Sequence, residues 1–363
     1  MSETSLAALL PPFRLLLLGY GHVARALLPL LATRGEWLAR ELGIRPLISG
    51  VGSRSQGLFI FPDGLDVSYL IHEPGPLQDL QPPGTRVETA EAFLYAGKAV
   101  GADALIELTT LNPLDGQPAL DHMRMALQTG MHVITANKGP IAYGLAELQK
   151  LAHTHDAQFR FESAVLDGLP LINLSEYTLP TVDIQAFRAL LNTTSSLVLS
   201  MIEEGQSLDA ALARAQQLGI AEADPWHDLD GWDAVMKTTI LANTLLEGHL
   251  LPYMVERAGI RDLSADEVRA AARSGTPIRL LSQACRDRDG VIASVRPQRI
   301  QPDDILRVGT SMTGIISLET GAMGPITLVE HEPTVQRTAY GVFSDLVNIV
   351  RQRQGPLSAS SML

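Results

Sequence analysis

Residues 13–28 read FRLLLLGYGHVARALL, and this stretch decides the fold of the first half of the chain. The run 13–18 is apolar and stops at a glycine, which predicts a buried parallel strand. The next six residues have the spacing G-x-G-x-x-A and open an amphipathic helix. In a strand–turn–helix unit this spacing lets a pyrophosphate approach the backbone at the helix N-terminus. The alternative is a glycine-rich turn without a ligand. The residues predicted to bind a dinucleotide here are Gly19, Tyr20, Gly21, His22, Val23 and Ala24.

Strands and helices alternate after this motif, which predicts a parallel sheet with crossover helices over residues 12–158. The expected strands are 13–18, 46–51, 104–108 and 132–135, and the expected helices are 23–42, with Pro29 inside it, 117–129 and 143–155. The chain past residue 158 mixes strands and helices differently, so we expect a separate α+β domain over 159–336. Its expected strands are 159–165, 184–191, 277–285, 291–295 and 315–329, and its expected helices are 207–217, 231–246 and 264–273. A last helix, about 337–354, is expected to pack back on the first domain. The predicted fold class is α/β, with an N-terminal Rossmann-type domain and a second α+β catalytic and dimerisation domain.

Composition narrows the class of function. The chain has 363 residues, a net charge of −12 and 46% hydrophobic residues. The acidic balance argues against a nucleic-acid or anionic-membrane partner. A single cysteine excludes an internal disulfide framework and a cysteine-rich metal site. Neither a signal peptide nor a transmembrane helix is expected, so a soluble cytoplasmic protein is the prediction.

The end of the second strand bears on the choice of cofactor. An NAD-binding fold has an acid there for the ribose 2′-hydroxyl. This chain has Gly50-Val51-Gly52-Ser53-Arg54-Ser55 instead. The guanidinium of Arg54 can hold a 2′-phosphate in a bidentate fork, so NADP is favoured and NAD is the alternative. A solvated loop arginine is the other interpretation of Arg54.

Two further strand ends carry polar residues. Thr109 and Thr110 follow one strand, and Asn137 and Lys138, in TANKGP, follow the next. Ligands of open α/β sheets bind at this edge, so these side chains are expected to line a nicotinamide pocket. The ammonium of Lys138 can polarise a substrate oxygen there. The alternative is a helix capped by Asn137 beside an exposed lysine.

Residues 219–237, GIAEADPWHDLDGWDAVMK, are the richest stretch in the chain for function. Asp233 and Lys237 are four residues apart, so a helix that opens at Gly231 places both side chains on one face. Such a pair is a candidate for acid–base work on an alcohol or carbonyl. The alternative is an ordinary salt bridge on a solvated helix. The five carboxylates of the stretch belong to Glu222, Asp224, Asp228, Asp230 and Asp233.

Glu162 is unusual inside the apolar run FESAVL, because a buried carboxylate needs a partner. A monovalent cation, coordinated together with backbone carbonyl groups, would satisfy it. Ordinary hydrogen bonds would do so equally well.

Taken in order, these motifs resemble homoserine dehydrogenases of the shorter kind, without a C-terminal regulatory domain. The resemblance runs from about residue 14 to 349. It rests on G-x-G-x-V-A, ELTTLNPLDGQPALDHMRMAL, ITANKGP, FESAVLDGLP, LLNTTSSLVL, AEADPWHDLDGWDAVMK and GVFSDL. Two turns depart from the family pattern. The usual V-G-G-G-x-P reads VLDGLP here, and the usual N-G-T-T-N reads NTTSS.

The resemblance implies reversible hydride transfer between L-homoserine and L-aspartate 4-semialdehyde with NAD(P), in threonine and methionine biosynthesis, by a homodimer. It implies that Lys237, with Lys138, acts on the reacting oxygen and that Asp233 supports Lys237. Glu222 and Asp228 would bind the substrate ammonium, and Thr194 would meet the polar end of the substrate. Gly341, in GVFSDL, would contact the cofactor, and Glu162 and Val165 match a sodium site. The alternatives are a related oxidoreductase for another small amino acid or aldehyde, and a catalytically silent nucleotide-sensing regulator.

Overall fold

The computed structural model describes residues 10–72, 75–80, 83–218, 220–221, 224–308 and 312–353. The chain folds into two compact units. Unit 1 comprises Met1–Gly168 and Thr334–Leu363, and unit 2 comprises Leu169–Pro333. The boundary therefore follows residue 168 and not residue 158. The intervening segment stays with unit 1 because its first two residues are a strand of the first sheet, and the Glu162 N–H donates to Asp345 of the C-terminal helix (2.9 Å).

Unit 1 is built on a seven-stranded sheet with the order β4-β3-β2-β1-β5-β6-β7. The neighbouring pairs β2–β1, β1–β5, β5–β6 and β6–β7 are parallel. β3 pairs antiparallel with both of its neighbours, β2 and β4. The sheet is therefore mixed, with an antiparallel edge that the sequence did not predict. The strands are β1 (Pro12–Leu18), β2 (Arg45–Ser53), β3 (Gly57–Asp66), β4 (Thr85–Val87), β5 (Ala104–Glu107), β6 (His132–Thr135) and β7 (Phe159–Arg160).

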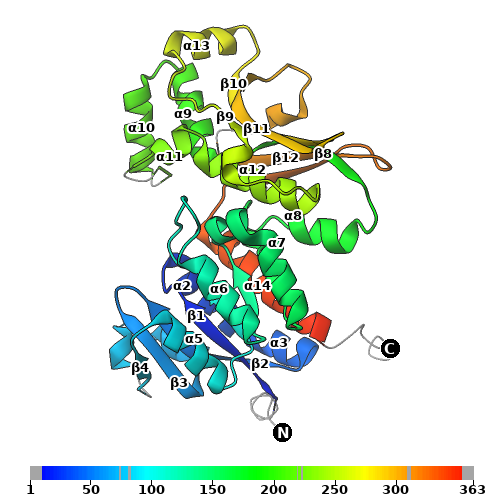
Figure 1. Cartoon of the computed structure of the whole chain (residues 1–363). Coiled ribbons are helices and arrows are strands. Elements are labelled where there is room, and N and C mark those ends of the chain that lie inside the picture. The colour runs from blue at the N-terminus through cyan, green and yellow to red at the C-terminus, as the bar shows by residue number, and fades with distance from the viewer. Residues whose placement is uncertain are drawn as a thin grey trace. The chain divides into compact units, whose positions relative to one another are not determined.

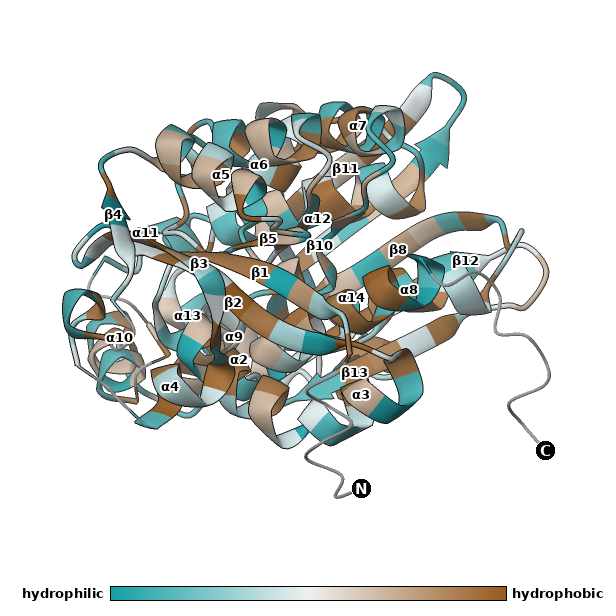
Figure 2. Cartoon of the chain, turned by 90° about the horizontal axis from the view of Figure 1, so that it is seen from below, coloured by the Kyte–Doolittle hydropathy of each residue, from teal (hydrophilic) through white to brown (hydrophobic). Residues whose placement is uncertain are grey.

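Helices cover both faces of this sheet (Figure 1). The helices α5, α6 and α7 pack on one face, and α2, α3, α4 and α14 form the other layer. Figure 2 shows hydrophobic residues along much of β1, β2 and β3 between these layers, which explains why the strands read as apolar runs. The helices are α2 (His22–Thr33), α3 (Gly35–Leu42), α4 (Val67–His72), α5 (Ala90–Ala99), α6 (Ala119–Gln128), α7 (Lys138–Thr154) and α14 (Val335–Arg353), with short turns η1 (Leu77–Asp79) and η2 (Glu162–Ala164).

The register of the parallel strands brings four strand ends to one edge. Leu18 of β1 pairs with Gly52 of β2 and with Glu107 of β5, and Glu107 pairs in turn with Thr135 of β6. The turns that follow these strands are therefore neighbours along the carboxyl edge of the sheet, where open α/β folds bind their ligands.

Unit 2 contains a six-stranded sheet with the order β13-β12-β8-β10-β11-β9. All pairs are antiparallel except β11 with β9. A hydrophobic core lies between this sheet and α9, α12 and α13, and contains Ile278, Leu280 and Val295. The strands are β8 (Ile184–Leu190), β9 (Glu256–Arg257), β10 (Ile278–Asp287), β11 (Gly290–Arg299), β12 (Thr313–Thr320) and β13 (Ile326–His331). The helices and short turns are α8 (Leu171–Asn173), η3 (Leu174–Thr178), α9 (Thr193–Glu203), α10 (Leu208–Gln217), α11 (Trp226–Leu229), α12 (Trp232–Leu245), η4 (Pro252–Met254), α13 (Ala265–Arg273) and η5 (Ile305–Val308).

Three predicted elements differ from the structure. The helix expected over 23–42 breaks at Arg34, before Gly35, whereas Pro29 is accommodated inside α2. The strand expected over 159–165 ends at Arg160, and Glu162 opens the turn η2. The strand expected over 315–329 is the hairpin β12–β13. It reverses at Thr320, whose hydroxyl donates to the Gly324 carbonyl (2.7 Å) and accepts the Met323 N–H (3.1 Å).

Among the described residues, no helix has the length and apolar character needed to cross a membrane. The fold class predicted from the sequence, a Rossmann-type α/β domain followed by an α+β domain, is confirmed.

Candidate active site

The glycine turn after β1 has the geometry that a pyrophosphate requires. Gly19 has φ +100°, and a Cβ there would collide with the backbone of Leu108 and Thr109. Its N–H donates to the Gly52 carbonyl (2.8 Å), which fixes the turn against the end of β2. Gly21 is exposed, and a Cβ there would meet nothing within 4 Å. It precedes α2 without a side-chain cap, so the first-turn N–H groups can receive an anion.

The other residues of this motif shape the turn. Ala24 is fully buried, as close helix–strand packing demands. The Tyr20 hydroxyl donates to the Leu70 carbonyl (3.4 Å), and the Arg25 guanidinium lies 5.2 Å from its ring centroid. His22 is exposed and Val23 is half-buried. The residues present therefore fit a dinucleotide phosphate at this turn.

Arg54 lies in the exposed turn between β2 and β3. The Ser53 and Ser55 hydroxyls flank it, 3.4 Å apart, and Ser53 Oγ also accepts the Gln56 N–H (3.1 Å). This turn begins one residue after Gly52, whose carbonyl holds Gly19. The chain thus offers a guanidinium and two hydroxyls, and no acid, at the position where the cofactor ribose is expected.

The turns after β5 and β6 are joined by hydrogen bonds. The Asn137 side-chain amide donates to the Thr109 carbonyl (3.2 Å), and its oxygen accepts the Gly139 N–H (3.3 Å), so Asn137 caps α7. Lys138 is the first residue of α7 and is half-buried, and Thr110 is exposed at the same edge. Asn137 is the predicted helix cap, and in that position it also ties the two turns together.

Three residues predicted from the resemblance lie in the last part of unit 1. Gly341 is buried in α14, where a Cβ would collide with the Ser163 hydroxyl, so close packing against η2 accounts for this glycine. Glu162 and Val165 are both buried. In the described ranges, no three His, Cys, Asp or Glu side chains gather as a metal-binding group.

The residues that the sequence predicts for acid–base chemistry, Asp233 and Lys237, lie together in unit 2. Lys237 Nζ is 3.1 Å from Asp233 Oδ2, one turn earlier in α12, and 2.7 Å from the Leu191 carbonyl oxygen. The Asn192 side-chain amide donates to Asp233 (3.0 Å) and to Asp228 (2.8 Å). Asn192 also caps α9, because its side-chain oxygen accepts the Ser195 N–H (2.8 Å). One asparagine therefore orients both carboxylates and joins them to the end of β8.

Burial distinguishes this cluster from a surface ion pair. The Lys237 and Asp233 side chains are only 16% and 11% exposed, and Asn192 and Thr194 are buried. Burial, and secondarily the Asp233 charge, raise the pKa of Asp228, whereas hydrogen bonds from Thr194 and Asn192 act in the opposite direction. The ordinary solvated salt bridge is therefore the wrong interpretation of the Asp233–Lys237 spacing.

Two arginine–tryptophan stacks support the loop before α12. The Arg257 guanidinium lies 4.2 Å from the Trp232 ring centroid, and that of Arg261 lies 4.0 Å from Trp226. Both arginines also contact Asp230, through its carbonyl and its carboxylate respectively. The Asp230 carboxylate is therefore paired with a cation outside the cluster.

Sequence reasoning found some members of these sites and missed others. Lys237, Asp233, Asp228 and Thr194 come together in unit 2, and the predicted cofactor residues lie in unit 1. Glu222 lies outside the described residues. Asn192 and the buried Glu107 were missed. Asn192 could have been noticed as a polar residue directly after an apolar strand. Glu107 could have been noticed as an acid inside the apolar run ALIEL.

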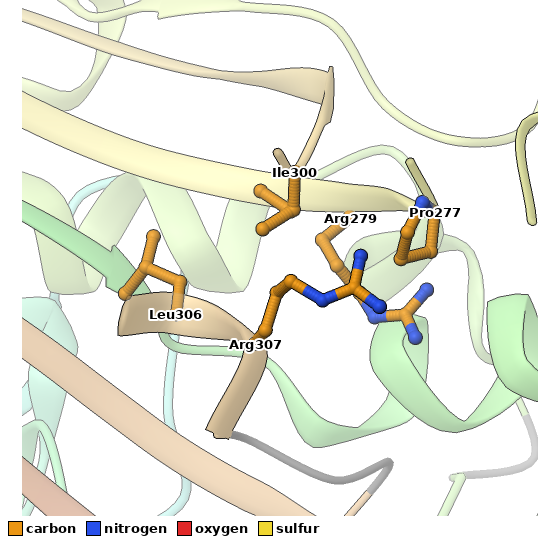
Figure 3. Close-up of a pocket in the computed structure, with 5 residues that line it drawn as sticks. All are labelled: Pro277, Arg279, Ile300, Leu306 and Arg307. Carbon is orange, nitrogen blue, oxygen red and sulfur yellow. The ribbon is translucent and has the colours of Figure 1, made fainter. Parts of the chain in front are cut away.

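A pocket of about 100 Å³ lies elsewhere in unit 2 (Figure 3). It is lined by Pro277, Arg279, Ile300, Leu306 and Arg307. Its arginines have partners, because Arg279 donates to Glu203 and Arg307 to the Gly275 carbonyl (both 2.6 Å). None of the lining residues belongs to the lysine–carboxylate cluster.

Comparisons with known proteins show similarity to homoserine dehydrogenases. A family model described as homoserine dehydrogenase matches residues 170–347. An NAD(+)-dependent homoserine dehydrogenase of Pseudomonas canavaninivorans is 38% identical over 341 residues, which are 93% of this chain and 96% of that protein. A homoserine dehydrogenase structure from Thiobacillus denitrificans aligns with a TM-score of 0.80 at 26% identity, over 94% of this chain and 74% of that one. A hyperthermophilic archaeal homoserine dehydrogenase in complex with NADPH aligns with a TM-score of 0.79 at 25% identity, over 95% and 99%.

Proposed function

The chain belongs to the homoserine dehydrogenase family, and from this premise we propose how its residues carry out reversible hydride transfer between L-homoserine and L-aspartate 4-semialdehyde. The activity is that of an NAD(P)-dependent oxidoreductase in amino-acid biosynthesis. A cytoplasmic location is part of the proposal, because substrate and cofactor are both soluble metabolites.

The observation that carries the proposal is the hydrogen bonding of Lys237. Its ammonium has three N–H donors, and within the described residues two acceptors hold it, Asp233 and the Leu191 carbonyl. One donor is left for a substrate oxygen. We propose that Lys237 gives its proton to the carbonyl oxygen during reduction and takes the hydroxyl proton during oxidation.

The charge of the cluster suits an amino-acid substrate. Asp228, Asp233 and Lys237 together carry one negative charge in excess when ionised. A substrate ammonium would neutralise it, and a charge-assisted hydrogen bond to Asp228 would position the substrate. Thr194, beside Asp228, and Glu222 complete the proposed set for the substrate.

We propose that Gly19–Ala24 holds the cofactor pyrophosphate and that Thr109, Thr110 and Asn137 line the nicotinamide pocket. Gly341 is proposed to border the cofactor. NAD(P), when bound, accepts or supplies the hydride. Lys138, at the N-terminal end of α7, is proposed as the second ammonium that stabilises negative charge on the reacting oxygen.

Arg54 supports a preference for NADP over NAD. A guanidinium with two neighbouring hydroxyls is a donor set for a 2′-phosphate, and no acid stands at Gly50–Ser55 to accept the 2′-hydroxyl of NAD. In contrast, the Pseudomonas canavaninivorans relative is named as an NAD(+)-dependent enzyme, so NAD is the alternative cofactor. Comparing kcat/KM for the two cofactors tests the preference.

A sodium ion at Glu162 and Val165 is also proposed. The carboxylate and the peptide carbonyl are the hard oxygen donors that such a cation requires. The test compares turnover in sodium, potassium and choline chloride at equal ionic strength. Equal rates in the three salts would count against the cation.

We further propose that a second copy of the chain covers the sheet of unit 2. Ile278, Leu280 and Val295 of this sheet face the helices. On its other face, Arg188, Gln283 and Ser317 stand in one row across β8, β10 and β12 and are half-buried. Light scattering after size exclusion would give the mass of a dimer, and a monomer at micromolar concentration would contradict this part.

The decisive experiment is a spectrophotometric assay of the purified protein. With L-homoserine and either NADP or NAD, absorbance of the reduced nicotinamide should grow. With aspartate semialdehyde and reduced cofactor, it should decay. Turnover of another small amino alcohol or aldehyde in place of homoserine would favour the related oxidoreductase. Cofactor binding without turnover of any substrate in the panel would favour the silent regulator.

A further inference from the structure

Glu107 is a buried carboxyl group to which the proposed chemistry gives no part. It ends β5, a central strand of the first sheet that pairs with β1 and β6, and its exposed fraction is 0%. The neighbours Leu105 and Ile106 are equally buried. A carboxyl group in this position loses its hydration, so its retention needs compensating contacts.

These contacts come from the two turns that carry the predicted nicotinamide residues. Glu107 Oε1 accepts the Thr109 N–H (2.9 Å) and the Thr109 hydroxyl. Glu107 Oε2 lies 3.2 Å from the Thr135 hydroxyl, which in turn accepts the Asn137 N–H (2.9 Å). The Asn137 amide returns to the Thr109 carbonyl (3.2 Å) and closes the ring. The carboxyl group therefore contacts residues next to both turns.

Glu107 accepts hydrogen bonds from its neighbours and forms no ion pair within the described part of the chain. Burial raises the pKa of Glu107, whereas hydrogen bonds from Thr109, Thr135 and Asn137 act in the opposite direction. Ion pairing does not account for the placement of this acid. A positively charged ligand at the turns above it would supply the missing opposite charge.

The cofactor of the proposed reaction has such a charge in only one of its two states. The nicotinamide ring is a cation when oxidised and neutral when reduced. A cationic ring near Glu107 would favour the ionised form of this acid, and the resulting carboxylate would attract the oxidised cofactor alone. The low dielectric of the surroundings would strengthen that attraction.

We propose that Glu107 is a specificity-determining residue that makes the enzyme bind oxidised nicotinamide cofactor more tightly than it would without this carboxylate. The inference rests on the proposed function, because it takes Thr109 and Asn137 as the lining of the nicotinamide pocket.

Glu107→Gln is the test, because glutamine keeps the shape and an oxygen acceptor for Thr109 but removes the charge. Dissociation constants of NADP and NADPH are measured by tryptophan fluorescence or calorimetry in the absence of homoserine. The ratio of the constants, oxidised over reduced, should rise about tenfold, which corresponds to 1.4 kcal/mol. An unchanged ratio would overturn the inference.

Asp103→Asn is the matched control. Asp103 precedes the other end of β5, accepts the Arg14 N–H (2.8 Å) and lies about 13 Å from Glu107 at the rise of a strand. The ratio should stay at the wild-type value in this variant, and an equal rise would assign the effect to the fold and overturn the inference. If Glu107→Gln does not fold, Glu107→Asp keeps the charge and should keep the wild-type ratio, and a tenfold rise there would overturn the inference. Failure of the proposed function is measured separately, because the wild-type protein would then show no turnover of homoserine, with or without cofactor binding.

Discussion

Lys237 Nζ lies 3.1 Å from the Asp233 carboxylate, and neither side chain is more than about one-sixth exposed. A buried pair of this kind differs from a surface ion pair, since removing one partner leaves the other charge without compensation. The ion pair therefore holds the Lys237 ammonium group in place beside the carboxylates, as its proposed acid–base role requires.

Lys237→Ala should lower kcat by about a thousandfold, within the range that general acid–base groups contribute. The cofactor dissociation constant should change little, because the proposed cofactor residues belong to unit 1. Steady-state kinetics and fluorescence titration measure the two effects. Lys150→Ala, an exposed lysine of α7, is the control and should behave as wild type. Unchanged kcat in Lys237→Ala would remove this lysine from the catalytic role.

Asn192→Ser separates the two roles of Asn192, which caps α9 and donates hydrogen bonds to two carboxylates. Serine can still cap α9, but it cannot donate to Asp228 and Asp233 at once. We expect KM for homoserine to rise about tenfold, the effect of losing one hydrogen bond to a charged group. Thermal stability should change little in Asn192→Ser and fall in Asn192→Ala, which loses the cap as well. A wild-type KM in the serine variant would show that the bridge does not matter.

The raised pKa of Asp228 predicts a pH dependence of substrate binding. Only the ionised carboxylate can receive an ammonium group, so KM for homoserine should fall as the pH rises through this pKa and then level off. Asp228→Asn should show a high KM without that limb. The effect on stability has the opposite sign. The folded protein holds this proton more tightly than the unfolded chain, so the contribution of Asp228 to stability is lost as the pH rises through the raised pKa.

Arg54→Ala should raise KM for NADP about tenfold or more and leave KM for NAD nearly unchanged, because only NADP carries the 2′-phosphate. Arg86→Ala, an exposed arginine of β4 in the same unit, serves as the control. Equal losses with both cofactors would dismiss the contact between Arg54 and the 2′-phosphate.

The lowered pKa of His132 predicts that the folded protein loses stability in acid. Burial, and secondarily the Arg353 charge, lower its pKa from 6.5 to about 4, and its Nδ1 accepts the Gln158 N–H (3.0 Å). The unfolded chain therefore takes up this proton first, and about 3 kcal/mol of stability should be lost as the pH falls from 6.5 to 4. His132→Asn, whose side-chain oxygen can accept the same N–H, should flatten this limb in urea unfolding at several pH values. An equally steep acid limb in the variant would mean that other groups cause it.

The strong local signals in the sequence predicted the first half of the fold well. The run 13–18 and the glycines after it encode a strand and a turn within a dozen residues, so no distant contact is needed to recognise them. The edge strands β3 and β4 escaped prediction because Gly57–Asp66 contains a proline and a glycine, which weaken a strand pattern. The sequence did not predict that residues 159–168 belong to unit 1. Their placement depends on a contact between Glu162 and Asp345, which are 183 residues apart.

For the candidate site too, residues with a local sequence signal were predicted, and residues that depend on distant contacts were missed. Lys237 and Asp233 were found because helical spacing is a local rule. Asn192 was missed because its importance arises when the end of β8 meets α12, 41 residues later. Glu107 was missed because an isolated acid in an apolar run does not reveal which turns will close around it.

The helix α14 is the last described part of the chain, yet Val342, Leu346 and Ile349 in it belong to the core of unit 1. During synthesis on the ribosome, the β-strands of unit 1 emerge early and must wait for this helix while some 165 residues of unit 2 are translated. Unit 2 can therefore reach its native state before the core of unit 1 is complete, although the strands of unit 1 are made first.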